Sequence, residues 1–467
     1  MAEQKNKAKI GRVISVQGPV VDVQFSSAKE MPKISDTILT QTVNNREITL
    51  EVAEHSSGNI ARCISIHSTI DLQRNSAAFP QGDPIQIPVG DMLFGRIVNV
   101  TGQPIDNLGE FSIKEKRSIR RGQLDTRVQR KEIEQKSLSV METGIKMFDL
   151  LFPMVKGSKT GILGGAALGK TILTLEMIQH VVKAYEGRCV FTGVGERIRE
   201  GNELFYELRK HEIADKVMMV FGQMNEPPGA RFGAAMTGIT LAESIQRQNK
   251  DVLLFVDNIF RYIQAGAEIS TLLGRVPSET GYQPTLIQEA SDFHERIRSS
   301  QEAGGSITCM EAVYVPADDL TDPAVVAIFS FLDSVLILSR ERIQLGLYPA
   351  IDPLTSSSAN LDPDIVGEHH FKVAQEVIRV LQKYEELKRI VMVIGIDELS
   401  SSDRMIYERG RKLQFFMTQP FFVAEAYTGK KGEYVTTAQT VDGCQRIVEG
   451  HFDRKPAEEF YMIGALD

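Results

Sequence analysis

Eight residues in the first half of the chain have the types and the spacing needed to hold a triphosphate. The segment Gly-Gly-Ala-Ala-Leu-Gly-Lys-Thr satisfies the pattern G-x-x-x-x-G-K-[ST], between an apolar strand-like run and a helix-like run. In such a turn the backbone N–H groups converge on an anion at a helix N-terminus, Lys170 adds positive charge for the terminal phosphates, and Thr171 offers Mg²⁺ a hydroxyl ligand. The pattern therefore predicts triphosphate binding. The predicted nucleotide-binding residues of this loop are Gly164, Gly165, Ala166, Ala167, Leu168, Gly169, Lys170 and Thr171.

A carboxylate at the end of a second apolar run is a candidate metal-binding group. Residues 251–257, Asp-Val-Leu-Leu-Phe-Val-Asp, are typical of a buried parallel strand whose carboxyl end faces the ligand crevice. Asp257 would then hold Mg²⁺ through water. A buried strand followed by Asp is also a common entry into a turn, so the metal-binding interpretation depends on the phosphate loop upstream.

Charged residues follow a third strand-like run. Residues 189–200, Cys-Val-Phe-Thr-Gly-Val-Gly-Glu-Arg-Ile-Arg-Glu, pass from a strand pattern through glycines to charge. Glu196 is a candidate to accept a proton from water and to orient that water for in-line attack. Arg197 and Arg261 are candidates to stabilise charge on a transferred phosphoryl group, although their spacing alone fits surface salt bridges equally well.

Three stretches of different pattern must position these groups. Residues 1–90 contain short β-branched runs between turn residues, which predicts a small all-β barrel or sandwich. Residues 91–366 alternate strand-like and helix-like segments, as in a mostly parallel sheet with helices on its faces, and residues 367–467 have apolar residues at helical spacing. We therefore predict a multi-domain α/β protein. The predicted strands of the first stretch are 11–16, 20–25, 48–52, 60–66 and 85–89, and its predicted turns are Gly18-Pro19, Asn44-Asn45 and Gly82-Asp83-Pro84.

Composition excludes several classes of protein. The 467 residues include 53 Lys and Arg against 61 Asp and Glu, so no overall positive field exists to hold nucleic acid. The four cysteines are far apart in the sequence, which predicts inert, reduced thiols rather than a metal knuckle or a disulfide framework. No run is apolar and long enough to span a bilayer, and the N-terminus lacks a signal-peptide pattern. We expect a chain that is soluble by itself and is not exported.

Six separate segments together resemble the catalytic beta subunit of the rotary F-type ATP synthase. The resemblance extends from about Gly11 to Gly464 and implies a β-barrel crown, a RecA-like P-loop nucleotide domain and a C-terminal helical domain. It also implies an alternating hexamer with an alpha-type subunit around a central gamma-type shaft, acting on Mg²⁺, ATP, ADP and phosphate. The complex would lie peripherally on the cytoplasmic face of a bacterial inner membrane, or on the equivalent organelle side, and serve an ion-conducting membrane sector. The segments are residues 164–171, 195–202, 222–231, 252–266, 281–285 and 314–323.

The resemblance also implies roles for individual residues. Glu196 would polarise the attacking water and Lys170 would contact the phosphates. Arg197 and Arg261 would contact the γ-phosphate. Further roles would fall to groups that order the metal, namely Thr171 directly and Glu200 and Asp257 through water, and to aromatic side chains on the adenine, namely Tyr348, Phe421 and Tyr427.

The residue at position 196 favours a catalytic role. Alpha-type subunits of the same hexamer have Gln where this chain has Glu196, and a neutral amide is a far weaker proton acceptor than a carboxylate. Two other classes stay open. One is a structural subunit that binds nucleotide without turnover, and the other is a homohexameric RecA-like ATPase of a secretion system or a helicase.

Several positions depart from the family pattern. Ala167 replaces a glycine of the phosphate loop, which would weaken nucleotide binding without abolishing it if that position needs a positive φ. Ser401 and Ser402 replace carboxylates at an acidic tip expected to meet the shaft. Asp71 and Asn75 replace two turn glycines, and we expect the turn to survive because Asp and Asn tolerate left-handed backbone. The departures suggest a divergent or second-copy catalytic subunit.

Overall fold

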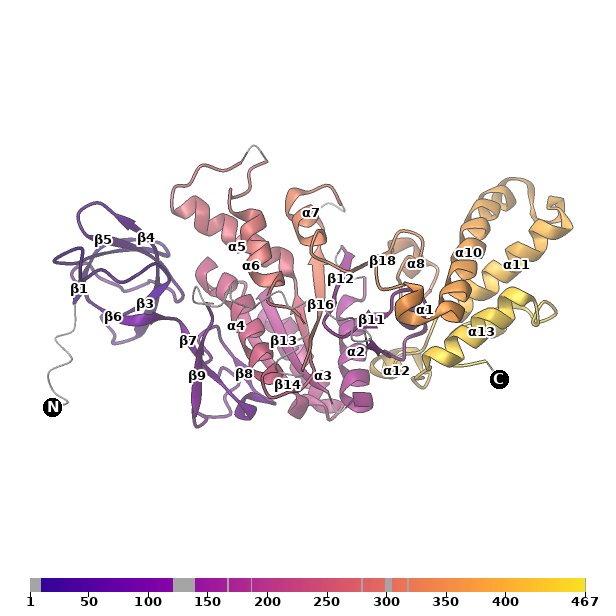
Figure 1. The fold of residues 1–467 in the computed structure, drawn as a ribbon, viewed down its shortest axis with the longest axis horizontal. Helices are drawn as coiled ribbons and strands as arrows, with labels where there is room; N and C mark the ends of the chain where they lie inside the picture. Colours follow the sequence, from indigo (N-terminus) through magenta and orange to yellow (C-terminus); the bar gives the residue numbers. More distant parts are fainter. Residues whose placement is uncertain are drawn as a thin grey trace. The chain divides into compact units, whose positions relative to one another are not determined.

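The computed structural model describes residues 10–120, 139–165, 168–185, 187–278, 280–298, 305–316 and 319–466 (Figure 1). The chain forms two compact units, and the stretches of sequence that make up one unit alternate along the chain with those of the other. Unit 1 comprises Met1–Glu132, Cys189–Gly305 and Thr321–Ile328, and unit 2 comprises Ile133–Arg188, Ser306–Leu320 and Phe329–Asp467. The predicted boundaries at residues 90 and 366 stay a prediction.

Unit 1 begins with a closed barrel of six strands in the order β1-β2-β5-β4-β3-β6 (Figure 1). Alternate side chains of these strands are buried, as the period-two pattern of β-branched residues requires. The turns of the hairpins β1–β2 and β3–β4 fall at Gly18 and Asn45, as predicted, and both residues have positive φ. The strands are β1 (Gly11–Gln17), β2 (Val20–Gln24), β3 (Asp36–Gln41), β4 (Glu47–Ser56), β5 (Ile60–Ser65) and β6 (Ala77–Pro84).

Two sequence predictions for this region were wrong in detail. The run at residues 85–89 is β7 (Gln86–Val89), which lies outside the barrel and pairs with β9 (Glu115–Ser118). The barrel is instead completed by β3 and β6, which the pattern did not identify. Residues 82–84, predicted as a turn, lie inside β6, where the exposed side chains gave no alternation to detect.

The substituted turn of the barrel keeps its left-handed backbone. Asp71 has φ 68° and Asn75 has φ 67°, which confirms the expectation that Asp and Asn would replace the glycines without loss of the turn. The amide of Asn75 donates to the carbonyl of Val13, so this turn is tied to the first barrel strand.

Beyond the barrel and the β7–β9 pair, the described residues of unit 1 form a run of four strands in the order β15-β13-β14-β8. The pairs β13–β14 and β14–β8 are parallel. Helix α4 packs against β14, β15 and α5, and its residues are nearly all buried, which explains why its sequence lacks a polar face. The elements are β8 (Ile97–Val98), β13 (Arg188–Glu196), β14 (Val217–Gln223), β15 (Val252–Asp257), α3 (Ile198–Lys210), α4 (Pro228–Gln246), α5 (Ile259–Leu272), α6 (Leu286–His294) and α7 (Pro323–Phe329).

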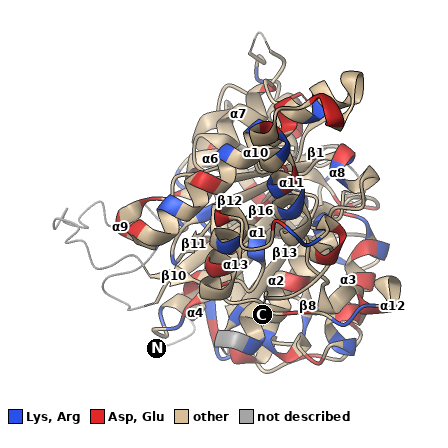
Figure 2. Ribbon diagram, turned by 90° about the vertical axis from the view of Figure 1, so that its right-hand side faces the viewer, with Lys and Arg blue, Asp and Glu red and all other residues tan. Residues whose placement is uncertain are grey.

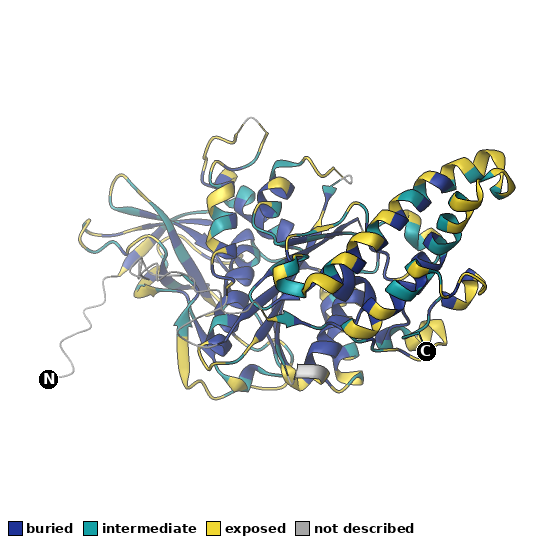
Figure 3. Ribbon diagram, turned by 45° about the vertical axis from the view of Figure 1, so that its right-hand side comes forward, coloured by how far each residue is buried: buried dark blue, intermediate teal, exposed yellow. Residues whose placement is uncertain are grey.

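Unit 2 contains four further sheet strands in the order β18-β17-β12-β16, with β12 parallel to both neighbours and β18 antiparallel to β17. Strands β12 and β16 are buried along nearly their whole length (Figure 3). Both sheet segments are thus mostly parallel, as predicted. The elements of this part are α1 (Lys146–Leu151), β10 (Val140–Met141), β11 (Met154–Val155), β12 (Lys159–Gly164), α2 (Lys170–Tyr185), β16 (Ile307–Tyr314), β17 (Ser334–Ile337), α8 (Arg340–Gln344) and β18 (Ser357–Ser358).

The C-terminal part of unit 2 is helical, which confirms the third element of the predicted fold class. Helices α10 and α11 pack against each other and against α13, and acidic and basic residues are interspersed along their outer faces (Figure 2). Among the described residues, no helix combines the length and the apolar character that crossing a bilayer requires. The helices are α9 (Pro363–Val366), α10 (Glu368–Ile394), α11 (Ser401–Phe416), α12 (Glu425–Thr428) and α13 (Thr437–Glu449).

All four cysteines are free and buried, in agreement with the prediction of inert thiols. Cys63 lies in the barrel, Cys189 in β13, Cys309 in β16 and Cys444 in α13. Burial raises the pKa of each thiol, to about 12 for Cys189 and Cys444.

Candidate nucleotide-binding and catalytic site

The phosphate loop of unit 2 lies between β12 and α2, the context that the sequence pattern requires. β12 ends at Gly164, Gly169 has φ 85°, and α2 begins at Lys170. The Lys170 ammonium donates to the carbonyl oxygen of Gly164 at 2.7 Å, which holds it over the loop. The Thr171 side chain is exposed at the second position of the helix. Ala166 and Ala167 lie outside the described residues.

The three predicted adenine-binding side chains line one cavity of about 270 Å³ beside this loop. Tyr348, Phe421 and Tyr427 reach it from segments far apart in the sequence, and Leu168 and Gly169 of the loop line it too. Phe421 is 5% exposed, whereas Tyr348 is 41% exposed and Tyr427 is 81% exposed. A mostly apolar cavity with aromatic walls suits the flat face of a base.

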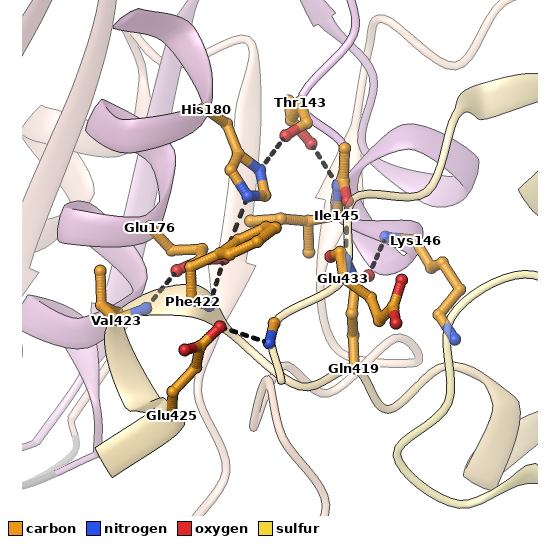
Figure 4. Close-up of polar contacts among 12 residues, drawn as sticks. Thr143, Ile145, Lys146, Glu176, His180, Gln419, Phe422, Val423, Glu425 and Glu433 are labelled. Atoms are coloured by element: carbon orange, nitrogen blue, oxygen red, sulfur yellow. Dashed lines mark hydrogen bonds and ion pairs between the residues drawn. The ribbon is translucent and has the colours of Figure 1, made fainter. Parts of the chain in front are cut away.

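The two aromatic segments are bonded to each other. The backbone amide of Gln419 donates to the carbonyl of Tyr348 at 2.9 Å, two residues before Phe421. The Gln419 side chain, 1% exposed, accepts from the amide of Lys146 and donates to the carbonyls of Gly144 and Glu433 (Figure 4). Both polar atoms of this side chain are therefore hydrogen-bonded. These bonds hold Gln419 in place at the start of the segment that carries Phe421.

Sequence analysis missed one carboxylate that is bonded to the segment next to Phe421. Glu176 is fully buried on α2 and accepts from the backbone amides of Phe422 and Val423, in η5 (Phe422–Ala424), at 3.0 and 3.1 Å (Figure 4). Glu176 lies in a buried stretch of α2 that also contains the polar residues Gln179 and His180. The helix sequence does not identify what Glu176 binds, because its partners lie 246 and 247 residues away.

Unit 1 carries the other predicted group of residues, and Glu196 is at its centre. Glu196 is the last residue of β13, and the register of β13 with β14 shifts between Val194 and Glu196. Gly195, inside this bulge, has φ 64°, and a Cβ atom there would lie 2.7 Å from Cδ of Arg261. Glycine is thus needed both for the left-handed turn and for the close approach of the arginine.

Glu196 is a buried carboxylate with long polar contacts. It is 7% exposed, its Oε1 lies 3.4 Å from Nδ2 of Asn258, and Nε of Arg261 lies 4.0 Å away. Burial raises its pKa to about 8, and the charge of Asp257 and the neighbouring Glu200 carboxyl act in the same direction, against the guanidinium of Arg261. A carboxylate in this state is a better proton acceptor than an exposed one.

The remaining predicted residues of unit 1 surround Glu196. Asp257 ends β15, and Asn258 follows it in left-handed backbone conformation, with φ 67°, before α5 begins. Arg197 is exposed and its Nη1 lies 3.6 Å from Oε1 of Glu200. The structure therefore brings Glu196, Glu200, Asp257 and Arg261 together within unit 1. Within unit 2 it brings Tyr348, Phe421 and Tyr427 together with Leu168 and Gly169 of the phosphate loop.

Comparison with known families assigns three consecutive parts of the chain to family models. Residues 144–358 match the model of the ATP synthase alpha/beta family, nucleotide-binding domain, and residues 13–78 match the beta-barrel domain of the same family. Residues 359–455 match the C-terminal domain of V and A type ATP synthase. The chain belongs to the ATP synthase alpha/beta family. The family does not by itself specify an F-type or a V/A-type complex.

Each unit of this ATP synthase alpha/beta family member carries oxygen donors of the kind that a magnesium nucleotide uses. Thr171 offers a hydroxyl, and Glu200 and Asp257 offer carboxylates, the oxygen ligands that Mg²⁺ prefers while it keeps several waters. Within the described ranges, no three His, Cys, Asp or Glu side chains are grouped as a metal site of their own.

Proposed function

We propose that this chain is the catalytic subunit of a rotary F-type ATP synthase, which makes or hydrolyses Mg-ATP. The observation that carries the proposal is Glu196, a buried carboxylate at a strand end, with Arg261 beside it and with raised pKa. A neutral amide at this position would orient water but would accept a proton poorly.

In this proposal each group of residues has one task. The loop amides and Lys170 hold the phosphates, and Tyr348, Phe421 and Tyr427 hold the base. Bound Mg²⁺ would neutralise phosphate charge, with Thr171 as a direct ligand and Glu200 and Asp257 ordering its waters. Glu196 accepts a proton from the attacking water, and Arg197 and Arg261 stabilise charge on the transferred group. The proposal requires the residues of both units to act on the same nucleotide.

The proposal includes an assembly. The chain would alternate with an alpha-type subunit in a hexamer around a gamma-type shaft, as family membership implies. The shaft would couple ATP turnover to H⁺ or Na⁺ transport by a separate membrane sector, with the ring peripheral to the membrane and without a nucleic-acid partner. Which ion is coupled is decided in the membrane sector.

A second candidate is the corresponding subunit of a V/A-type complex. The match of residues 359–455 to the V and A type C-terminal domain favours it. Co-purification of the tagged chain from its own cells separates the two, because the F-type proposal expects F-type alpha and gamma subunits in the isolated complex. Recovery of V/A-type subunits would replace it with the second candidate.

The activity is tested with the chain alone and co-expressed with alpha-type and shaft subunits from its own genome. Mg²⁺-dependent ATPase activity that appears only with the partners supports the catalytic role. Full activity of the chain alone would indicate a homohexameric ATPase. Bound nucleotide without turnover in both preparations would indicate a structural subunit.

A further inference from the structure

One buried charge of unit 2 has no task in the proposed chemistry. Glu176 lies on α2, about two turns after Lys170, and is fully buried. Transferring a carboxylate into a protein core is unfavourable unless hydrogen bonds and an opposite charge compensate. Its partners therefore indicate what the residue holds in place.

The first partners of Glu176 are two consecutive backbone amides. Its Oε1 accepts from Phe422 at 3.0 Å and its Oε2 accepts from Val423 at 3.1 Å, so both carboxylate oxygens grip η5 (Figure 4). Phe421, whose ring lines the base cavity, immediately precedes these amides. The carboxylate thus bonds the helix of the phosphate loop directly to the segment that carries the base-contacting ring.

The second partner is His180, one turn further along α2. Its Nδ1 lies 2.6 Å from the carbonyl oxygen of Thr143, and because a carbonyl can only accept, Nδ1 carries a proton. Its Nε2 lies 3.0 Å from Oε1 of Glu176, within ion-pair distance but outside hydrogen-bond geometry (Figure 4). The His180 ring also meets the ring of Phe422 edge-on, with centroids 5.6 Å apart.

We propose that Glu176, supported by His180, is the positioning residue that fixes Phe421 against the nucleotide base. The inference rests on the proposed nucleotide-binding function of the cavity. Glu176 touches neither the phosphates nor the reacting water, so its loss acts on the base and leaves the phosphate contacts in place. A purely structural role would weaken the binding of every ligand of the loop alike.

The test compares two ligands on the full-length chain by calorimetry, Mg-ATP and Mg-tripolyphosphate, which lacks the base. Glu176→Gln keeps the shape of the side chain but replaces one accepting oxygen by a donor that faces an N–H group. We expect it to weaken Mg-ATP binding about tenfold and to leave Mg-tripolyphosphate binding within about twofold. Equal weakening of both ligands, or of neither, would overturn the inference.

Two further variants keep the test decisive. Glu425→Gln is the matched control, because Glu425 accepts from the amide of Gly432 inside the same segment and does not bond it to α2; binding of both ligands should stay unchanged. His180→Asn keeps a donor for Thr143 but removes the ring nitrogen that lies against Glu176, so we expect about threefold weaker Mg-ATP binding, even where Glu176→Gln fails to fold. Unchanged Mg-ATP binding in His180→Asn would contradict the proposal.

A double variant links the effect to the ring. In a Phe421→Leu background the ring is already gone, so adding Glu176→Gln should change Mg-ATP binding by less than about twofold. A full tenfold loss in that background would assign the effect to some other contact. Failure of the unaltered chain to bind either ligand would refute the proposed function itself, which separates that outcome from failure of this inference.

Discussion

Each of the two units contains a buried glutamate with a proposed role in nucleotide binding or turnover, and the surroundings of these two residues differ. Glu176 is fully buried, accepts two amide hydrogen bonds and faces His180 at 3.0 Å. Glu196 is 7% exposed, but its contacts to Asn258 and Arg261 are 3.4 and 4.0 Å long, and its pKa is raised to about 8. The compensated carboxylate holds the backbone, whereas the poorly compensated one binds a proton more tightly than an exposed carboxylate does.

The first prediction concerns Glu196, the glutamate with the proposed catalytic role. Glu196→Gln should lower ATPase turnover of the assembled ring by a factor of about 10²–10⁴, because an amide cannot take the proton from water. Mg-ATP binding should be kept, because the base cavity and the phosphate loop are unaltered. Steady-state rates and nucleotide titrations of the same preparation measure both quantities. A variant that retained full turnover would refute the role of Glu196.

The second prediction concerns the contribution of the two glutamates to the stability of the fold. Glu176→Ala removes the acceptor of two buried amides and the partner of His180, so the free energy of unfolding should fall by about 3 kcal/mol. Glu196→Ala should cost less stability, because the carboxylate that it removes is poorly compensated. Urea unfolding of the full-length variants measures the difference. Equal losses in the two variants would show that the contrast between the glutamates has no energetic counterpart.

The third prediction concerns Lys146, a buried basic residue that is compared with the two buried glutamates. Lys146 in α1 is fully buried, donates to the carbonyls of Ile463 and Gly464 and lies over the ring of Phe416. Burial lowers its pKa from 10.5 to about 7, with Cys444 and Glu433 facing it and acting in the opposite direction.

The lowered pKa of Lys146 predicts the direction in which stability changes with pH. Between about pH 7 and pH 10, Lys146 keeps its proton in the unfolded chain but has lost it in the folded chain. The free energy of unfolding should therefore rise with pH, by up to about 1.4 kcal/mol per pH unit from this group. The rise should be absent in Lys146→Met. Urea midpoints at pH 7, 8 and 9 provide the comparison, and parallel curves for the two proteins would contradict it.

The fourth and smallest effect concerns the rim of the base cavity. Tyr427 is 81% exposed, so Tyr427→Leu should weaken Mg-ATP binding by less than about threefold, well below the effect of losing the buried ring of Phe421. The same calorimetric titration measures both variants. A larger effect of Tyr427→Leu than of Phe421→Leu would mean that the exposed ring, rather than the anchored one, recognises the base.

The sequence was most informative where function and local backbone coincide. The phosphate loop was predictable because its glycines, Lys170 and Thr171 must be adjacent in the chain. The Asp71 and Asn75 turn was predictable for a similar reason, since left-handed backbone restricts the residue type at a single position. The fold class followed from periodicity, which is also a local property.

The rest depended on contacts between distant segments. Glu176 meets η5 across 246 residues, and nothing in the helix sequence specifies a backbone amide as its partner. Strand β6 was missed because its glycine and prolines resemble a turn, while its pairing with β1 and β3 is fixed by barrel closure. Assignment of the adenine-contacting rings came from resemblance, because an isolated aromatic residue has no distinguishing spacing.

The four buried thiols can serve as native probes of local unfolding. A thiol-specific reagent reacts with an exposed thiolate, so each cysteine stays unmodified until its own element opens. Cys63, Cys189, Cys309 and Cys444 lie in the barrel, in β13, in β16 and in α13. The order in which native protein becomes alkylated over time would therefore rank four parts of the fold by their opening free energies, without any engineered label.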